Sequence, residues 1–83
     1  AFFAGGSGHR VNIISAGPYA SRAAKSIGDI DTAINHVAER SPLKRPITAQ
    51  DVADTTLFLC SPLSSAITGE VIHVDAGYHA MAI

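Results

Sequence analysis

One apolar segment, residues 11–18, strongly limits how this chain can fold. The almost uninterrupted apolar run Val11–Ile14 stops abruptly at Ala16-Gly17-Pro18. Near-continuous apolar residues are typical of a parallel strand that is covered on both faces. Glycine lets backbone come close to another group, and proline ends the hydrogen-bond ladder. The segment predicts a buried strand over residues 10–15 that ends either beside a ligand or in a plain strand-to-loop turn.

A second strand is expected over Glu70–Val74, and helical patterns fill the sequence between the two strands. Such a connection makes a right-handed crossover, so the two strands are expected to be parallel. Both strands have the apolar character of central strands and cannot cover their own edges or faces. The first expected helix runs from Ser21 to about Ile27, and the second from Asp29 or Asp31 to Arg40. The third starts at Thr48, with a capping box to Asp51, and ends at Ser61-Pro62. A single helical turn is expected over Leu63–Ala66.

These elements predict an α/β fold in which residues 1–83 are the C-terminal portion of one doubly wound parallel sheet, incomplete on its own. The chain has no initiator methionine and opens on Ala1-Phe2-Phe3-Ala4, which has the character of a helix end. We therefore expect further sequence upstream. No internal repeat or linker divides the chain.

Composition excludes several functions. The net charge is −1 and no basic cluster is present, so nucleic-acid binding has no electrostatic support. No apolar run reaches the about 20 residues that a membrane helix needs. A single cysteine, Cys60, excludes an intrachain disulfide.

Three other features suggest chemistry, but their contexts argue against it. Gly5-Gly6-Ser7-Gly8 follows a helix and precedes a strand, whereas a dinucleotide-binding loop follows a strand and opens a helix. The four histidines lack metal-ligand spacing with a cysteine or glutamate, and we expect His73 to be a packed, hydrogen-bonded strand residue. Cys60 ends a helix rather than beginning one, so we expect a packed, inert thiol. We predict no metal site.

Two residues after the first strand are candidates for ligand contact. Ser21 lies at an expected helix N-terminus, where free N–H groups attract anions, so its hydroxyl either binds a pyrophosphate oxygen or only caps its own helix. A tyrosine that acts as an acid at neutral pH usually needs a nearby cation to favour its phenolate, and Lys25 lies six residues after Tyr19 in a different element. We expect the Tyr19 ring to pack on cofactor or substrate rather than to act as an acid.

Several motifs together resemble the C-terminal third of enoyl-acyl-carrier-protein reductase, a divergent branch of the short-chain dehydrogenase/reductase superfamily. The resemblance covers essentially the whole chain, and the alanine between serine and Gly-Pro separates this branch from ordinary ketoacyl reductases. Its motifs are Val11-Asn12-x-Ile14-Ser15-Ala16-Gly17-Pro18, Ser21-Arg22-Ala23-Ala24, Ser61-Pro62-Leu63-x-Ser65-Ala66-Ile67-Thr68-Gly69 and Val74-Asp75-x-Gly77.

The resemblance implies a Rossmann-like sheet, bound NADH, and reduction of the 2,3-double bond of an enoyl thioester on acyl carrier protein. It also implies a homotetramer in the bacterial cytoplasm or the plastid. The implied cofactor contacts are Ala16, Gly17 and Pro18 at the nicotinamide end, with Tyr19, Ala20, Ser21, Arg22 and Ala23 beside them. The implied acyl slot is lined by Tyr19, Ala23, Ala24, Ile27 and Ile30, although simple core packing would also explain an apolar helix here.

Two positions depart from the family pattern. Tyr19 stands where leucine or isoleucine is more common, and Asp29 stands where related proteins often carry an apolar residue. The family's glycine-rich loop, catalytic tyrosine and catalytic lysine belong upstream of Ala1, so no catalytic residue is assigned in this chain. Two alternatives stay open, namely another short-chain reductase acting on a carbonyl, and a non-catalytic piece that packs with a partner subunit.

Overall fold

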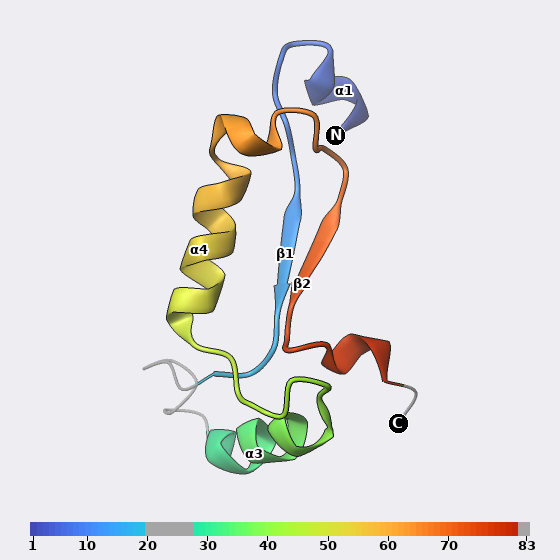
Figure 1. Cartoon of the computed structure of the whole chain (residues 1–83). Coiled ribbons are helices and arrows are strands. Elements are labelled where there is room, and N and C mark those ends of the chain that lie inside the picture. Colours follow the sequence, from blue (N-terminus) through green and yellow to red (C-terminus); the bar gives the residue numbers. More distant parts are fainter. Residues whose placement is uncertain (20–27, 82–83) are drawn as a thin grey trace.

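The computed structural model describes residues 1–19 and 28–81 (Figure 1). Two parallel strands stand side by side, with one helix along them and another beyond one end of the sheet. The described elements are α1 (Phe2–Gly5), β1 (Ile13–Ala16), α3 (Ile30–Arg40), α4 (Ala49–Leu59), the 3₁₀ turn η1 (Pro62–Ser64), β2 (Val71–Val74) and the 3₁₀ turn η2 (Tyr78–Ala80).

The two strands pair in parallel, as predicted, with Ile13 opposite Val71 and Ala16 opposite Val74. The first strand is shorter at its start than the sequence predicted. Side chains take part in the bonds of residues 11 and 12, although Val11 O also accepts from the Gly69 N–H at 2.9 Å. The Val11 N–H donates to Thr68 Oγ1 at 3.0 Å, and the Asn12 side chain bonds Ile67 O at 3.1 Å and the Glu70 N–H at 3.0 Å. Regular pairing therefore begins at Ile13.

Helix α4 contacts both strands and forms part of the crossover between them (Figure 1). Its start is the predicted capping box. The Asp51 N–H donates to Thr48 Oγ1 at 3.2 Å, and the Thr48 N–H donates to Asp51 Oδ2 at 2.8 Å. These reciprocal bonds satisfy amides that have no partner inside the helix.

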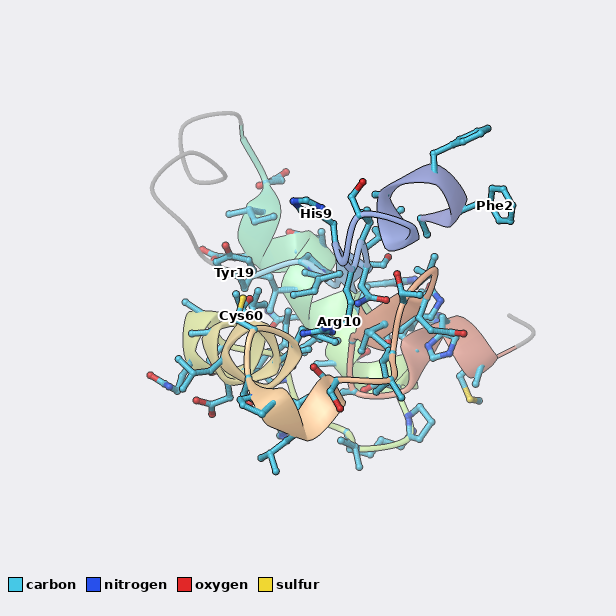
Figure 2. All side chains as sticks on the ribbon, turned by 90° about the horizontal axis from the view of Figure 1, so that it is seen from above. Phe2, His9, Arg10, Tyr19 and Cys60 are labelled. Atoms are coloured by element: carbon cyan, nitrogen blue, oxygen red, sulfur yellow. The ribbon has the colours of Figure 1, made fainter. Side chains whose placement is uncertain are left out.

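The last turn of α4 is held by side chains from two other elements. Arg10 lies beside it (Figure 2) and donates to Leu59 O at 2.8 Å and Ile67 O at 3.0 Å. The buried Ser64 hydroxyl of η1 donates to the carbonyl oxygens of Phe58 and Leu59. The helix end, η1 and the entry to β1 are thereby joined.

Helix α3 lies beyond the carboxyl ends of the strands (Figure 1) and contacts η2. Asp29 occupies its N-cap position, as expected, but the Asp29 side chain makes no capping hydrogen bond. The helix ends at Ser41-Pro42, as predicted, because a residue before proline avoids the α region. Ser41 is fully buried and its hydroxyl donates to Ala38 O.

Much of the apolar surface is uncovered. Among residues 1–19 and 28–81, the buried apolar residues are Ile47 and Ala76, whereas Ile13 in β1 is 60% exposed and Leu57 in α4 is 74% exposed. Phe2 points away from the rest of the chain (Figure 2). This exposure is what the sequence predicts for strands that need facing elements from elsewhere. Within the described ranges, no helix is both long and apolar enough to cross a bilayer.

Candidate functional site

The carboxyl ends of β1 and β2 meet at one edge of the sheet. Ala16 ends β1, and the next residue, Gly17, donates its N–H to Val74 O of β2 at 2.9 Å. Gly17 thus extends the strand pairing by one bond before Pro18 turns the chain away. In α/β sheets this edge is where ligands bind.

A side chain at position 17 would crowd Asp75. A Cβ atom there would lie 3.2 Å from Asp75 Cβ and 3.3 Å from Asp75 Cα. Both distances are shorter than ordinary van der Waals contact, so glycine is what lets the two strand ends touch. The contact joins the predicted cofactor segment directly to the residue that follows β2.

Asp75 is a buried carboxylate that organises the turn after β2. Its Oδ1 accepts from the Gly77 N–H at 3.0 Å and its Oδ2 accepts from the His79 N–H at 3.1 Å. The His79 ring nitrogen Nδ1 lies 3.1 Å from both carboxylate oxygens. Burial by itself would raise the pKa of Asp75, but the hydrogen bonds from His79 and Gly77 outweigh burial and lower that pKa.

The turn that Asp75 caps has left-handed backbone at two consecutive residues. Ala76 has φ +58° and Gly77 has φ +90°. A Cβ atom on Gly77 would come within 2.9 Å of Pro42 Cγ, and the Leu43 N–H donates to Ala76 O at 3.1 Å. The loop that follows α3 is therefore fastened to the end of β2.

His73 joins Asp75 and His79 in a three-residue cluster that sequence spacing did not indicate. The two imidazole rings stack with centroids 3.8 Å apart and planes 10° apart, and His73 Nδ1 lies 4.0 Å from Asp75 Oδ2. All three residue types can bind metals, and their ligand atoms lie within 4.8 Å of one another. An imidazole nitrogen binds a metal ion that lies in the plane of its ring, so two imidazoles that share one ion need ring planes that meet at the ion. The planes of His73 and His79 are nearly parallel and stacked, so they do not meet at one ion. The prediction of a packed His73 was wrong in part, since its side chain stacks but stays 36% exposed.

The predicted site residues that the structure describes lie at this end of the sheet (Figure 1). Ala16 is exposed, Pro18 and Tyr19 are half-buried, and Ile30 is the half-buried first residue of α3. The other predicted residues, Ala20, Ser21, Arg22, Ala23, Ala24 and Ile27, lie outside the described residues.

The prediction that the Cys60 thiol is packed was wrong. Cys60 follows the last residue of α4, as expected, but it is exposed rather than packed. Its surroundings are Arg10, Asn12, Ile14 and the last turns of α4, which line an open hollow of ≈ 210 Å³. The apolar pattern of α4 could not show this, because exposure here depends on what covers the sheet.

A model of the enoyl-(acyl carrier protein) reductase family matches residues 1–79. The chain belongs to this family. Its Rossmann-like α/β fold is confirmed by a crystal structure of the Bacillus cereus enoyl-acyl carrier protein reductase with NADP⁺ and indole naphthyridinone. That structure is 46% identical, has a TM-score of 0.92, and is matched over 100% of this chain and 32% of its own.

Two curated enoyl-acyl-carrier-protein reductases are also close in sequence. The NADH enzyme FabI of Aquifex aeolicus is 51% identical over 92% of this chain and 28% of its own length. The chloroplastic NADH enzyme of Arabidopsis thaliana is 53% identical over 89% of this chain and 19% of its own length. This family member therefore spans less than a third of each curated relative.

Proposed function

We propose that residues 1–83 are the C-terminal third of a single Rossmann-like domain in an NADH-dependent enoyl-acyl-carrier-protein reductase of fatty acid synthesis. One observation carries the proposal. Gly17 lies at the carboxyl edge of the sheet, where an added Cβ would come within 3.2 Å of Asp75 Cβ, in a chain that is 51% identical to an NADH-dependent member of the family. A glycine-proline segment at this edge is suited to face a flat ring.

In this proposal Ala16, Gly17 and Pro18 lie against the nicotinamide, which supplies the hydride when NADH is bound. Tyr19 to Ala23 contact the cofactor, and Ser21 lies near the pyrophosphate. The small and aliphatic side chains suit an apolar slot for the acyl chain. The slot residues are Tyr19, Ala23, Ala24, Ile27 and Ile30.

This chain binds and orients, and the proton-handling residues belong to the upstream part of the domain. The Ala16–Pro18 segment would hold the nicotinamide when NADH is bound. NADH would supply a hydride to the β-carbon of the enoyl thioester, an upstream tyrosine would stabilise the enolate oxygen, and delivery of a proton to the α-carbon would complete the saturated product. Positioning of this kind contributes strongly to rate, because a bound geometry near the reactive one replaces a bimolecular encounter.

The proposed substrate is an enoyl thioester on acyl carrier protein, and the proposed assembly is a homotetramer of the full-length protein. The proposed location is the bacterial cytoplasm or the plastid, in keeping with relatives from Aquifex aeolicus and the Arabidopsis chloroplast. NADH is the proposed cofactor, although the Bacillus cereus structure holds NADP⁺. Both reduced nucleotides therefore belong in the assay.

The test uses the full-length protein that contains this chain. Oxidation of NADH and NADPH is followed at the nicotinamide absorbance with crotonyl and acetoacetyl thioesters as substrates. The proposal expects NADH oxidation with the crotonyl thioester and little with the acetoacetyl thioester. The opposite preference would identify a short-chain reductase acting on a carbonyl, and no oxidation with either would favour a packing role.

A further inference from the structure

Asp75 makes two different contacts on its two sides, and together they connect the turn after β2 to the proposed cofactor segment. A Cβ atom added to Gly17 would lie 3.2 Å from Asp75 Cβ, and the Gly17 N–H donates at 2.9 Å to Val74 O, the carbonyl oxygen of the peptide bond that leads into Asp75. Its carboxylate bonds the N–H groups of Gly77 and His79 and the His79 ring. A shift of Asp75 would therefore displace the Val74 carbonyl that holds the Gly17 N–H.

The turn held by Asp75 needs an external restraint. Ala76 adopts φ +58°, which L-residues with a Cβ rarely do and which costs free energy. The Asp75 side chain is only 10% exposed, so water cannot easily replace the bonds from its carboxylate. Loss of the carboxylate would remove the acceptor of the part-buried Gly77 and His79 N–H groups and let the turn relax.

We propose that Asp75 is a positioning residue for NADH, which fixes the Gly17-Pro18 segment against the nicotinamide by holding the turn over residues 75–79 in place. Asp75 lies behind Gly17 and acts through it, without a role in hydride or proton transfer. This inference rests on the proposed function. It assigns the cofactor site a residue outside the Ala16–Ala23 segment.

The test compares Asp75→Asn, Asp75→Ala and His79→Gln in the full-length protein. Asparagine keeps one oxygen to accept a backbone N–H, whereas alanine keeps none. We expect the NADH dissociation constant to rise roughly tenfold in Asp75→Asn and further in Asp75→Ala, with a smaller rise in His79→Gln. The KM for the crotonyl thioester should stay within about twofold, because the acyl slot is formed by other residues.

The matched control is Asp54→Asn on the exposed face of α4, where the carboxylate bonds only a neighbouring surface glutamine in the described structure. It should leave NADH affinity unchanged. All binding is measured well below the melting temperature of each variant. If Asp75→Ala does not fold, Asp75→Asn and His79→Gln still decide the matter.

Unchanged NADH affinity in folded Asp75 variants would overturn the inference, as would a parallel rise in the NADH and thioester constants. The dissociation constant for NADH is measured without turnover. A wild-type protein that binds NADH but does not reduce the enoyl thioester would contradict the proposed function alone. A wild-type protein that does not bind NADH would contradict both.

Discussion

Gly17 has no side chain, and this lets the end of β1 come close to Asp75 at the end of β2. The sequence predicted that the first strand ends at Gly17-Pro18, and it left open whether that end lies beside a ligand or is a plain strand-to-loop turn. It could not predict the neighbour. Asp75 is far away along the chain, and the Gly17–Asp75 contact depends on the parallel register of β1 and β2.

Replacing Gly17 by alanine should weaken NADH binding in the full-length protein. The new Cβ would lie 3.2 Å from Asp75 Cβ, so one of the two segments must shift. We expect the KM for NADH to rise about tenfold, since small displacements of a binding segment have large kinetic effects. Steady-state kinetics with varied NADH measures this.

Gly5→Ala is the matched control for that experiment. A Cβ on Gly5 would meet nothing within 4 Å, and Gly5 lies at the end of α1. Its KM for NADH should equal that of the wild type. An unchanged KM in Gly17→Ala would show that the close contact at the strand ends does not position the cofactor.

At the scale of elements, local signals were reliable and distant ones were not. The capping box of Thr48 and Asp51 predicted the start of α4 correctly, because both partners lie within one helical turn. The start of β1 was predicted too early. Val11 bonds the Thr68 side chain and the Asn12 side chain bonds the backbone of Ile67 and Glu70, and no local pattern in the sequence predicts such long-range contacts.

Thr48→Ala in the full-length protein should lower the free energy of unfolding by about 1 kcal/mol, because the Asp51 N–H loses its acceptor. Chemical denaturation measures the change. Thr48→Ser keeps the hydroxyl and should stay close to the wild type. Equal losses in the two variants would assign the effect to the methyl group rather than to the cap.

The same helix start should respond to acid. A side-chain hydrogen bond from Arg45, followed by the backbone bond from Thr48, lowers the pKa of Asp51 from 3.8 to about 2. Because the folded-state pKa is depressed, the stabilisation is present above pH 3.8 and is lost as the pH falls through about 2. Unfolding measured between these pH values should show this loss.

Asp51→Asn removes the titrating group and should flatten that part of the acid dependence. It also lowers stability near neutral pH, since the ion pair with Arg45 at 3.0 Å is lost. An acid slope as steep in Asp51→Asn as in the wild type would place the titration on another carboxylate, such as Asp75.

At the scale of the whole molecule, the order of strand, helices and strand correctly predicted the parallel pair. The right-handed crossover stays a prediction from general rules of chain connection. The sequence also predicted that two central strands would lack cover, and Ile13 and Val71 are indeed exposed, at 60% and 48%. The position of the His73, Asp75 and His79 cluster could not be predicted, because it depends on the left-handed turn after β2.

The purified 83-residue chain should therefore show no NADH-dependent reduction of crotonyl thioester. Among the described residues only Ile47 and Ala76 are buried apolar residues, so the apolar core is small. The proposed proton-handling residues lie upstream. The full-length protein assayed in parallel is the control. Measurable turnover by the chain alone would mean that catalysis resides in these residues.

The most direct test of the proposed function follows the hydride itself. The full-length protein is given crotonyl thioester and NADH that carries deuterium at the transferred position of the nicotinamide, and the product is analysed by mass spectrometry and NMR. We expect a butyryl thioester with one deuterium on its β-carbon. A butyryl thioester without deuterium at that carbon, or no butyryl thioester at all, would contradict the proposed function.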